Sequence, residues 1–369
     1  MISQRIHNSP DYILFGIVTL LIFLGLIILA SASVVISQER FGENYYFLRH
    51  QVIFGLLPGL VLGWIVYRIP YLWWKKLALP LLLSSFLLLF LVFVPRIGYE
   101  YGGAARWIDV FGVSFQPSEI AKLGFILYLA TWLKDHEKKF ARFSESLLPF
   151  FFISGLLGLL LIVQPDVGTL GIITLTGAII YFLSGAPFHH IGIILGSGIG
   201  LLLLLVKIAP YRLNRITAFF NPRVDPLGIS YQINQALIAI GSGGLFGEGI
   251  GQSRQKYNFL PEPIADSIFA IWSEEAGFIG GIILISLFLF FIWRGFRIAL
   301  SAPDSFGRLA AGGITTWIGL QAFINMGAIS GLLPLTGVTL PFVSYGGSSL
   351  IIICVGVAIL LNISTYSKR

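Results

Sequence analysis

The sequence predicts an all-α polytopic membrane protein of about ten transmembrane helices, with a large extracytoplasmic loop between helices 7 and 8. Of its 369 residues, 56% are hydrophobic and 11% are charged, which is more apolar surface than one soluble core can bury. Apolar runs of about eighteen or more residues recur along the chain, and each can cross a bilayer as a helix. The alternating pattern of a membrane barrel is absent, which favours helices that pair their own backbone groups.

Ten candidate spans follow from these apolar runs, and residues 1–369 are expected to form a single integral membrane domain. The first span is too long for a signal peptide and lacks a small-residue cleavage site, so we expect it to be retained. The predicted spans are 12–34, 50–68, 77–95, 117–133, 147–164, 169–184, 190–208, 267–293, 309–329 and 342–362.

The distribution of Lys and Arg predicts that both termini are cytoplasmic. With that orientation the short outer loops hold only Arg40, Arg49, Arg96 and Arg106. The inner segments hold Arg5, Arg68, Lys75, Lys76, Lys134, Lys138, Lys139, Arg142, Arg294, Arg297, Arg308, Lys368 and Arg369. The net charge of +7 then reflects cytoplasmic loops, and no basic soluble segment is present to bind nucleic acid.

The longest segment outside the spans, 209–266, is predicted to be extracytoplasmic. Its apolar positions over 231–240 predict a short amphipathic helix at the membrane interface. A glycine-rich stretch, 241–251, follows a helix rather than a strand, which argues against a dinucleotide site, and no other motif indicates an organic cofactor. The single cysteine, Cys354, excludes disulfides within the chain and cysteine-based zinc sites.

Four spans that begin on the predicted outer face have polar starts. They begin near Gln116-Pro117-Ser118-Glu119, Pro165-Asp166-Val167-Gly168, Ala265-Asp266-Ser267 and Ser344-Tyr345-Gly346-Gly347-Ser348. Helix capping explains any one of these starts. As a set, several helix N-termini on one face would suit a ligand that bears phosphate.

Several ionisable residues lie near these starts. Glu119 and Lys122 share one helix face and form either a structural pair or part of a substrate site. Arg106 is an interfacial anchor or a phosphate ligand, and Asp166 is interpreted as a cap or structural partner rather than a reactive group. Asp266 ends a polar loop and opens an apolar helix, where burial raises the pKa of a carboxyl group and a helix N-terminus lowers it. Glu274 and Glu275 lie too deep to pair with Asp266, and both are expected to pair with cations of neighbouring helices.

A series of motifs then resembles one known family. The motifs are Gly103-Ala104-Ala105-Arg106-Trp107-Ile108, Phe115-Gln116-Pro117-Ser118-Glu119-Ile120-Ala121-Lys122-Leu123, Gln164-Pro165-Asp166-Val167-Gly168-Thr169, Gly241-Ser242-Gly243-Gly244-Leu245-Phe246-Gly247, Leu260-Pro261-Glu262, Gly331-Leu332-Leu333-Pro334-Leu335-Thr336-Gly337 and Pro341-Phe342-Val343-Ser344-Tyr345-Gly346-Gly347-Ser348-Ser349. Over about residues 30–363 the chain resembles the SEDS family (shape, elongation, division and sporulation). Within it the chain is more similar to the cell-division branch, FtsW, than to the elongation branch, RodA. The residues that indicate this branch are Gly251-Gln252-Ser253-Arg254-Gln255-Lys256, Ala302-Pro303-Asp304 and Gln321-Ala322-Phe323-Ile324-Asn325.

The resemblance implies a peptidoglycan glycosyltransferase that polymerises lipid II at the outer face of the bacterial cytoplasmic membrane, at the division septum. Asp266 matches the family's essential aspartate, in a stretch that usually reads Thr-Asp-Phe and here reads Ala265-Asp266-Ser267. It implies partners among division proteins, above all a class B penicillin-binding protein with one membrane helix. Glycines of spans 8 and 9 could contact that helix or pack within the bundle.

The mechanism expected is inverting glycosyl transfer with Asp266 as the base or as a residue that organises it. Arg106, Lys122 and the helix starts, which include Glu119, Asp166, Ser344, Gly346, Gly347 and Ser348, are the candidate substrate-binding residues. A divalent cation, Mg or Mn, could accompany the diphosphate, although no metal cage of the protein is visible. A lipid II flippase and an inactive division scaffold are the alternatives.

Overall fold

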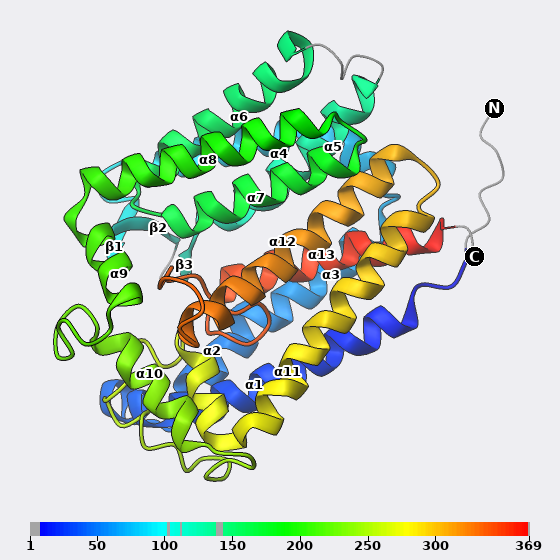
Figure 1. Cartoon of the computed structure of the whole chain (residues 1–369). Coiled ribbons are helices and arrows are strands. Elements are labelled where there is room, and N and C mark those ends of the chain that lie inside the picture. Colours follow the sequence, from blue (N-terminus) through cyan, green and yellow to red (C-terminus); the bar gives the residue numbers. More distant parts are fainter. Residues whose placement is uncertain (1–7, 102–103, 111–112, 138–142, 368–369) are drawn as a thin grey trace.

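A computed structural model describes residues 8–101, 104–110, 113–137 and 143–367. The helices lie in a bundle with two distinct ends (Figure 1). The termini lie at one end, here named the terminal end, and the loops that carry α9 and α10 lie at the other, the loop end. Seven residues used above fall outside the described residues: Arg5, Gly103, Lys138, Lys139, Arg142, Lys368 and Arg369.

Within the described residues, ten long helical segments follow one another, which confirms the predicted fold class. They are α1 (Tyr12–Phe41), the run of α2 (Tyr46–Gln51), a π-helical turn (Val52–Leu56) and α3 (Leu57–Arg68), then α4 (Leu72–Leu91), α5 (Pro117–Asp135), α6 (Phe143–Val163), α7 (Val167–Leu183), α8 (Phe188–Ile208), α11 (Ile268–Ser301), α12 (Ser305–Ile329) and α13 (Gly347–Thr365). The predicted boundaries differ most at the last span, which begins at Gly347 rather than at residue 342.

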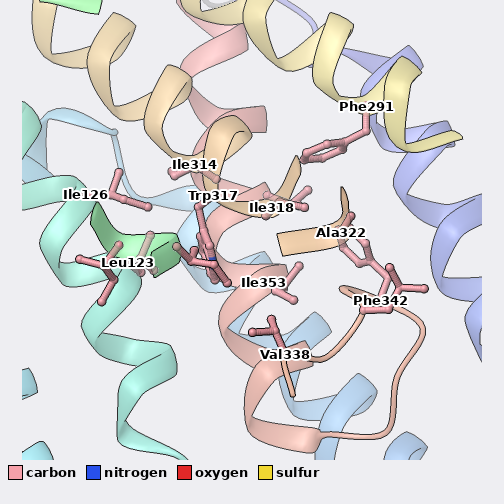
Figure 2. Packing of buried hydrophobic residues seen from close by; sticks show 14 of the residues in the cluster. Leu123, Ile126, Phe291, Ile314, Trp317, Ile318, Ala322, Val338, Phe342 and Ile353 are labelled. Atoms are coloured by element: carbon pink, nitrogen blue, oxygen red, sulfur yellow. The ribbon is translucent and has the colours of Figure 1, made fainter. Parts of the chain in front are cut away.

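Six of these segments are long and apolar enough to cross a membrane by themselves, and α6 and α7 contain shorter apolar helices. The two others, α5 and α12, are less apolar because they lie inside the bundle, where most of their side chains contact protein. Figure 2 shows side chains of α5, α11, α12, α13 and the loop around Val338 meeting around Trp317, which is fully buried. This core holds the polar starts of α5 and α13 at fixed positions.

Glycines allow the helices to approach closely. Gly55, Gly59 and Gly63 repeat every fourth residue and face α13, where a Cβ on Gly59 would lie 3.3 Å from the sulfur of Cys354. The glycines expected to contact either a partner or the bundle all meet atoms of this chain, so they pack within the bundle: Gly277, Gly280, Gly281, Gly312, Gly313 and Gly319.

A small antiparallel sheet lies between α4 and α5, where the sequence analysis expected a plain loop. Its strands are β1 (Gly98–Tyr101), β2 (Ala104–Val110) and β3 (Val113–Phe115), in the order β1-β2-β3. The sequence does contain a signal for this sheet: short runs of β-prone residues are separated by two glycine-containing breaks, a pattern typical of β-hairpins. The sheet places Arg106 over the start of α7.

The loop between α8 and α11 contains two helices, α9 (Pro210–Phe220) and α10 (Tyr231–Ser242). The second confirms the amphipathic helix predicted at 231–240, and its buried positions, among them Ala236, pack against α11. The first is a helix that the sequence analysis missed.

The glycine-rich stretch after α10 fills a break in α11. Gly277 interrupts that helix with φ 67° and ψ −166°, a conformation open to glycine alone. The N–H groups of Phe278 and Ile279 donate to the carbonyls of Gly244 and Leu245, while N–H groups of residues 248 and 249 donate to the carbonyls of residues 274 and 275. Four of the backbone groups at the break therefore have partners in the loop.

Candidate functional site

Asp266 lies at the loop end, two residues before α11, and is partly exposed. The N-cap of α11 is Ser267, and no side chain makes a capping hydrogen bond there. The carboxylate of Asp266 instead accepts from the side-chain amide of Gln232 on α10, at 3.3 and 3.4 Å. The same amide donates to the hydroxyl of Ser267 at 3.1 Å. Capping, which the sequence left open for Asp266, is therefore not its role in this structure.

The surroundings of Asp266 favour the protonated form of its carboxyl group. Desolvation and, to a smaller extent, the negative charge of Glu262 raise the pKa of Asp266, whereas the hydrogen bond from Gln232 and the charge of Arg215 lower it; together they bring it from 3.8 to about 6. A carboxyl group with this pKa is mostly ionised at neutral pH yet can accept a proton. This is the balance that a general base requires.

The chain just before α13 holds the Asp266 loop in place. Ser344 donates from its hydroxyl to the carbonyl of Ala265 at 2.6 Å, and the N–H of Tyr345 donates to the carbonyl of Ile264 at 2.9 Å. Ser344 therefore contacts the Asp266 loop through its side chain. The sequence analysis placed Ser344 in the first turn of a helix, but α13 begins three residues later, so Ser344 lies before it.

The start of α13 contacts α2 and α5. The N–H of Gly346, the N-cap residue, donates to the side chain of Gln51 at 3.0 Å. Gly347 packs against the backbone of Phe54, where a Cβ would lie 2.9 Å from the carbonyl oxygen. Ser348 accepts from the N–H of Gln116 at 3.4 Å. The start of α13 and the start of α5 are thus joined, as the grouping of polar helix starts predicted.

Glu119 and Lys122 form a buried ion pair on α5, with 2.8 Å between ammonium and carboxylate. The ammonium group also donates to Gln321 of α12 at 2.7 Å and lies 5.2 Å from the ring centroid of Trp317. Glu119 accepts a further hydrogen bond from Ser349 at 3.2 Å. Both charges are satisfied by protein in this structure, which is the structural alternative that the sequence left open.

Two amides on α12 connect this ion pair to Asp266. Gln321 donates to the carbonyl of Thr339 at 3.1 Å. One turn further along the helix, Asn325 donates to the carbonyls of Val338 and Asp266 at 2.7 and 2.8 Å. The segment before α13 therefore lies between the two groups and is bound to both.

Arg106 and Asp166 meet at the start of α7. The guanidinium group of Arg106 donates to the backbone carbonyls of Gln164, at 3.0 Å, and Pro165. Asp166 is the N-cap of α7 and accepts from the N–H of Thr169 at 3.2 Å, which confirms its interpretation as a cap. Its second oxygen is buried and accepts no hydrogen bond from the residues described.

Glu274 and Glu275 have structural partners, as expected, but the cation among them, Lys256, comes from the loop rather than from a neighbouring helix. Lys256 lies 2.9 Å from the carboxylate of Glu275, which also accepts from Ser31. Glu274 accepts from the hydroxyl of Ser253 and the N–H of residue 254. In the described part of the chain, no group of three or more His, Cys, Asp or Glu side chains could hold a metal ion.

Comparison with known proteins identifies the family. The profile of the family described as cell cycle protein, which groups FtsW, RodA and SpoVE, matches residues 11–369. The chain belongs to the SEDS family.

Similar SEDS proteins cover nearly the whole chain. The stage V sporulation protein E of Bacillus subtilis is 43% identical, over 98% of each chain. A probable peptidoglycan glycosyltransferase FtsW of Geobacter sp. is 40% identical over 99% of each, and that of Coxiella burnetii is 42% identical over 95% of this chain and 94% of its own. The similarity to FtsW agrees with the branch that the motifs indicated.

Two solved structures share the SEDS fold of this chain. One comes from a study of the structural coordination of polymerization and crosslinking by a peptidoglycan synthase complex, with a TM-score of 0.79 and 30% identity over 96% of this chain and 98% of that chain. The other is the rod shape determining protein RodA of Thermus thermophilus, with a TM-score of 0.73 and 30% identity over 98% of each chain.

The sequence analysis of this SEDS chain missed the role of the amide side chains in the site, although it noted Gln321 and Asn325 as features of the branch. Gln232, Gln321 and Asn325 have no charge, and each lies in a helix among apolar residues. Their roles depend on the loops that they contact, which are far away in the sequence. For Gln321 and Asn325 the available signal was a polar residue within a predicted span, since a buried amide requires partners.

Proposed function

We propose that this chain is a peptidoglycan glycosyltransferase that polymerises lipid II into glycan strands. The names of its FtsW relatives support this activity. The observation that carries the proposal is Asp266, a carboxylate at the loop end with a pKa raised to about 6. Three separate parts of the chain hold its position: Gln232 from α10, Asn325 from α12 and Ser344 from the segment before α13.

The reaction joins two lipid-linked sugars. The C4 hydroxyl of one lipid II attacks the anomeric carbon that bears the diphosphate of the growing chain, the new C–O bond forms, and the bond to the diphosphate breaks. Asp266 accepts the hydroxyl proton as the new bond forms. One displacement inverts the configuration from α to β, so no covalent intermediate on the enzyme is required.

The leaving diphosphate needs positive charge and hydrogen-bond donors. Arg106 and Lys122 are engaged by protein in this structure, so binding of the diphosphate would require them to exchange partners. Arg215, which is exposed and within electrostatic range of Asp266, is an additional cation for this role. A Mg or Mn ion would be held mainly by the diphosphate, with Asp266 and Glu262 as the carboxylates that can add oxygen ligands.

The loop end is assigned to the outer face of the cytoplasmic membrane, and both termini to the cytoplasm. The Lys and Arg distribution supports this orientation, because Arg68, Lys75, Arg294 and Arg308 lie at the terminal end. The candidate substrate-binding side chains at the loop end then lie on the side of the outer leaflet. Similarity to FtsW supports a location at the division septum.

A class B penicillin-binding protein is the proposed partner, together with other division proteins. The similarity to a structure from a peptidoglycan synthase complex supports a transpeptidase partner. Since the glycines of α11 and α12 pack within the bundle, the partner's helix would contact exposed apolar side chains of α11, such as Ile282, Leu289 and Phe290. Crosslinkers at these positions that never capture a single-helix partner in cells would refute this surface.

The test of the activity is direct. Purified protein, alone and with its transpeptidase partner, is supplied with lipid II on the loop-end side of a vesicle membrane, and glycan strands are measured. A polymerase makes glycan there. Movement of lipid II across the membrane without any glycan would support the flippase alternative, and neither activity would support the scaffold.

A further inference from the structure

A polar pocket and an apolar groove meet at the terminal end of α1. The pocket, of about 530 Å³, lies between the residues before α1 and the last turns of α11 and α13. The groove, of about 690 Å³, runs between α1, α3 and α13. Pro10 and Tyr12 line both cavities, so the two are adjacent at the start of α1.

The pocket carries an excess of positive charge. Arg294 pairs with Asp11 at 2.7 Å and is neutralised by it. Arg297 also lines the pocket, is exposed, and lies 5.4 Å from the ring centroid of Trp293. No carboxylate in the described residues forms an ion pair with Arg297, so its guanidinium group is available to an anion.

The groove is apolar and lies within membrane-spanning helices. Phe15, Ile22 and Leu26 of α1 form one wall, and Leu60 of α3 lies in the other. Because the glycines of α3 lack side chains, the groove reaches Cys354 on α13. Inside a bilayer such a groove is filled by a hydrocarbon chain rather than by water.

We propose that these two cavities form one site for an anionic phospholipid. The phosphate lies at Arg297, the lipid bends around Tyr12, and one acyl chain fills the groove. Charge complementarity selects the anionic lipid, because the pocket holds two arginines and one aspartate, and a zwitterionic head would add a further cation. The tryptophan beneath Arg297 places the guanidinium at the depth of lipid head groups.

The head group is tested with the whole chain in detergent, titrated with phosphatidylglycerol and with phosphatidylcholine of the same acyl chains, with bound lipid counted by native mass spectrometry. We expect the parent protein to bind phosphatidylglycerol more tightly than phosphatidylcholine. Arg297→Gln should bind phosphatidylglycerol about tenfold more weakly than the parent, because it loses one charge-assisted hydrogen bond. Lys76→Gln is the matched control, because Lys76 also lies over an exposed tryptophan, Trp73, but outside both cavities.

The groove is tested with two leucines of α3 that are each 52% exposed. Leu60→Trp fills the groove and should weaken binding of both lipids, whereas Leu57→Trp, which does not line it, should leave binding unchanged. Equal affinity for the two lipids, or equal effects within either matched pair, would overturn the proposal. So would a polyprenyl lipid or a partner helix, rather than a phospholipid, captured by a photo-crosslinker at position 60.

Discussion

Replacement of Asp266 by Asn separates a chemical role from a structural one. The capping position belongs to Ser267, so the substitution removes no cap. Gln232 can rotate its amide and accept from the new NH₂ group, which keeps the contact with α10. Folding raises the pKa of Asp266 from 3.8 to about 6, so ionisation of this group costs the folded state at most about 3 kcal/mol at neutral pH. The variant should therefore be as stable as the parent or more stable.

Its activity should nevertheless collapse. An amide accepts no proton near neutral pH, and loss of a general base typically slows a reaction about a hundredfold to ten-thousandfold. The assay is glycan formation from lipid II, with thermal unfolding and membrane insertion measured on the same preparation. Asp166→Asn is the control, because Asn caps α7 as well as Asp does, and polymerisation should stay within a fewfold of the parent. An Asp266→Asn protein that polymerises within a fewfold of the parent would refute the assignment of this residue.

Three further predictions concern pH, the helix break and topology. Activity should fall as the pH drops through about 6, where Asp266 becomes protonated. Removal of a charge should shift the midpoint of this fall: Glu262→Gln to lower pH and Arg215→Gln to higher pH. pH–rate profiles in which both variants shift the midpoint in the same direction would contradict this. Gly277→Ala should destabilise the fold by several kcal/mol, because a Cβ there would lie 2.3 Å from the backbone nitrogen of Gly247, whereas Gly196→Ala, with open space around it, should not lower the melting temperature. A cysteine at Ser242 should react with an impermeant maleimide added outside the cell; labelling from the cytoplasmic side alone would reverse the orientation.

The spans could be predicted because a bilayer requires a minimum length and an apolar composition, and both can be recognised in a local run of sequence. The last span was placed too early because the pair Phe342-Val343 was counted with the apolar run that starts at Leu350, although the chain is not helical until Gly347. Phe342 has a positive φ of 65°, and its ring lies against Phe288 and Phe291 of α11, contacts that its own hydrophobicity does not reveal. The sheet before α5 was missed because its strands are only three to seven residues long.

The candidate site was predicted in part. The polar helix starts, the pairing of Glu119 with Lys122, and the position of Asp266 at the start of a span could be identified from charge and position. Sequence alone could not show that Lys122 binds Gln321, because that contact joins helices almost two hundred residues apart. Resemblance identified Asp266, and the structure adds the physical reason for its altered pKa, which is packing of separate segments around the carboxylate.

The break in α11 also limits how this chain can vary in length. Four backbone hydrogen bonds join residues 244–249 to residues 274–279 in a fixed register, and Gly243 and Gly247 pack directly on the helix backbone. One inserted or deleted residue between 244 and 249 would shift the register and leave polar groups unpaired beside the membrane. Among the residues that the structure describes, none in a span forms a comparable backbone pairing with the turn at 221–230, before α10. Tags and reporter peptides should therefore be tolerated there and rejected a few residues after α10.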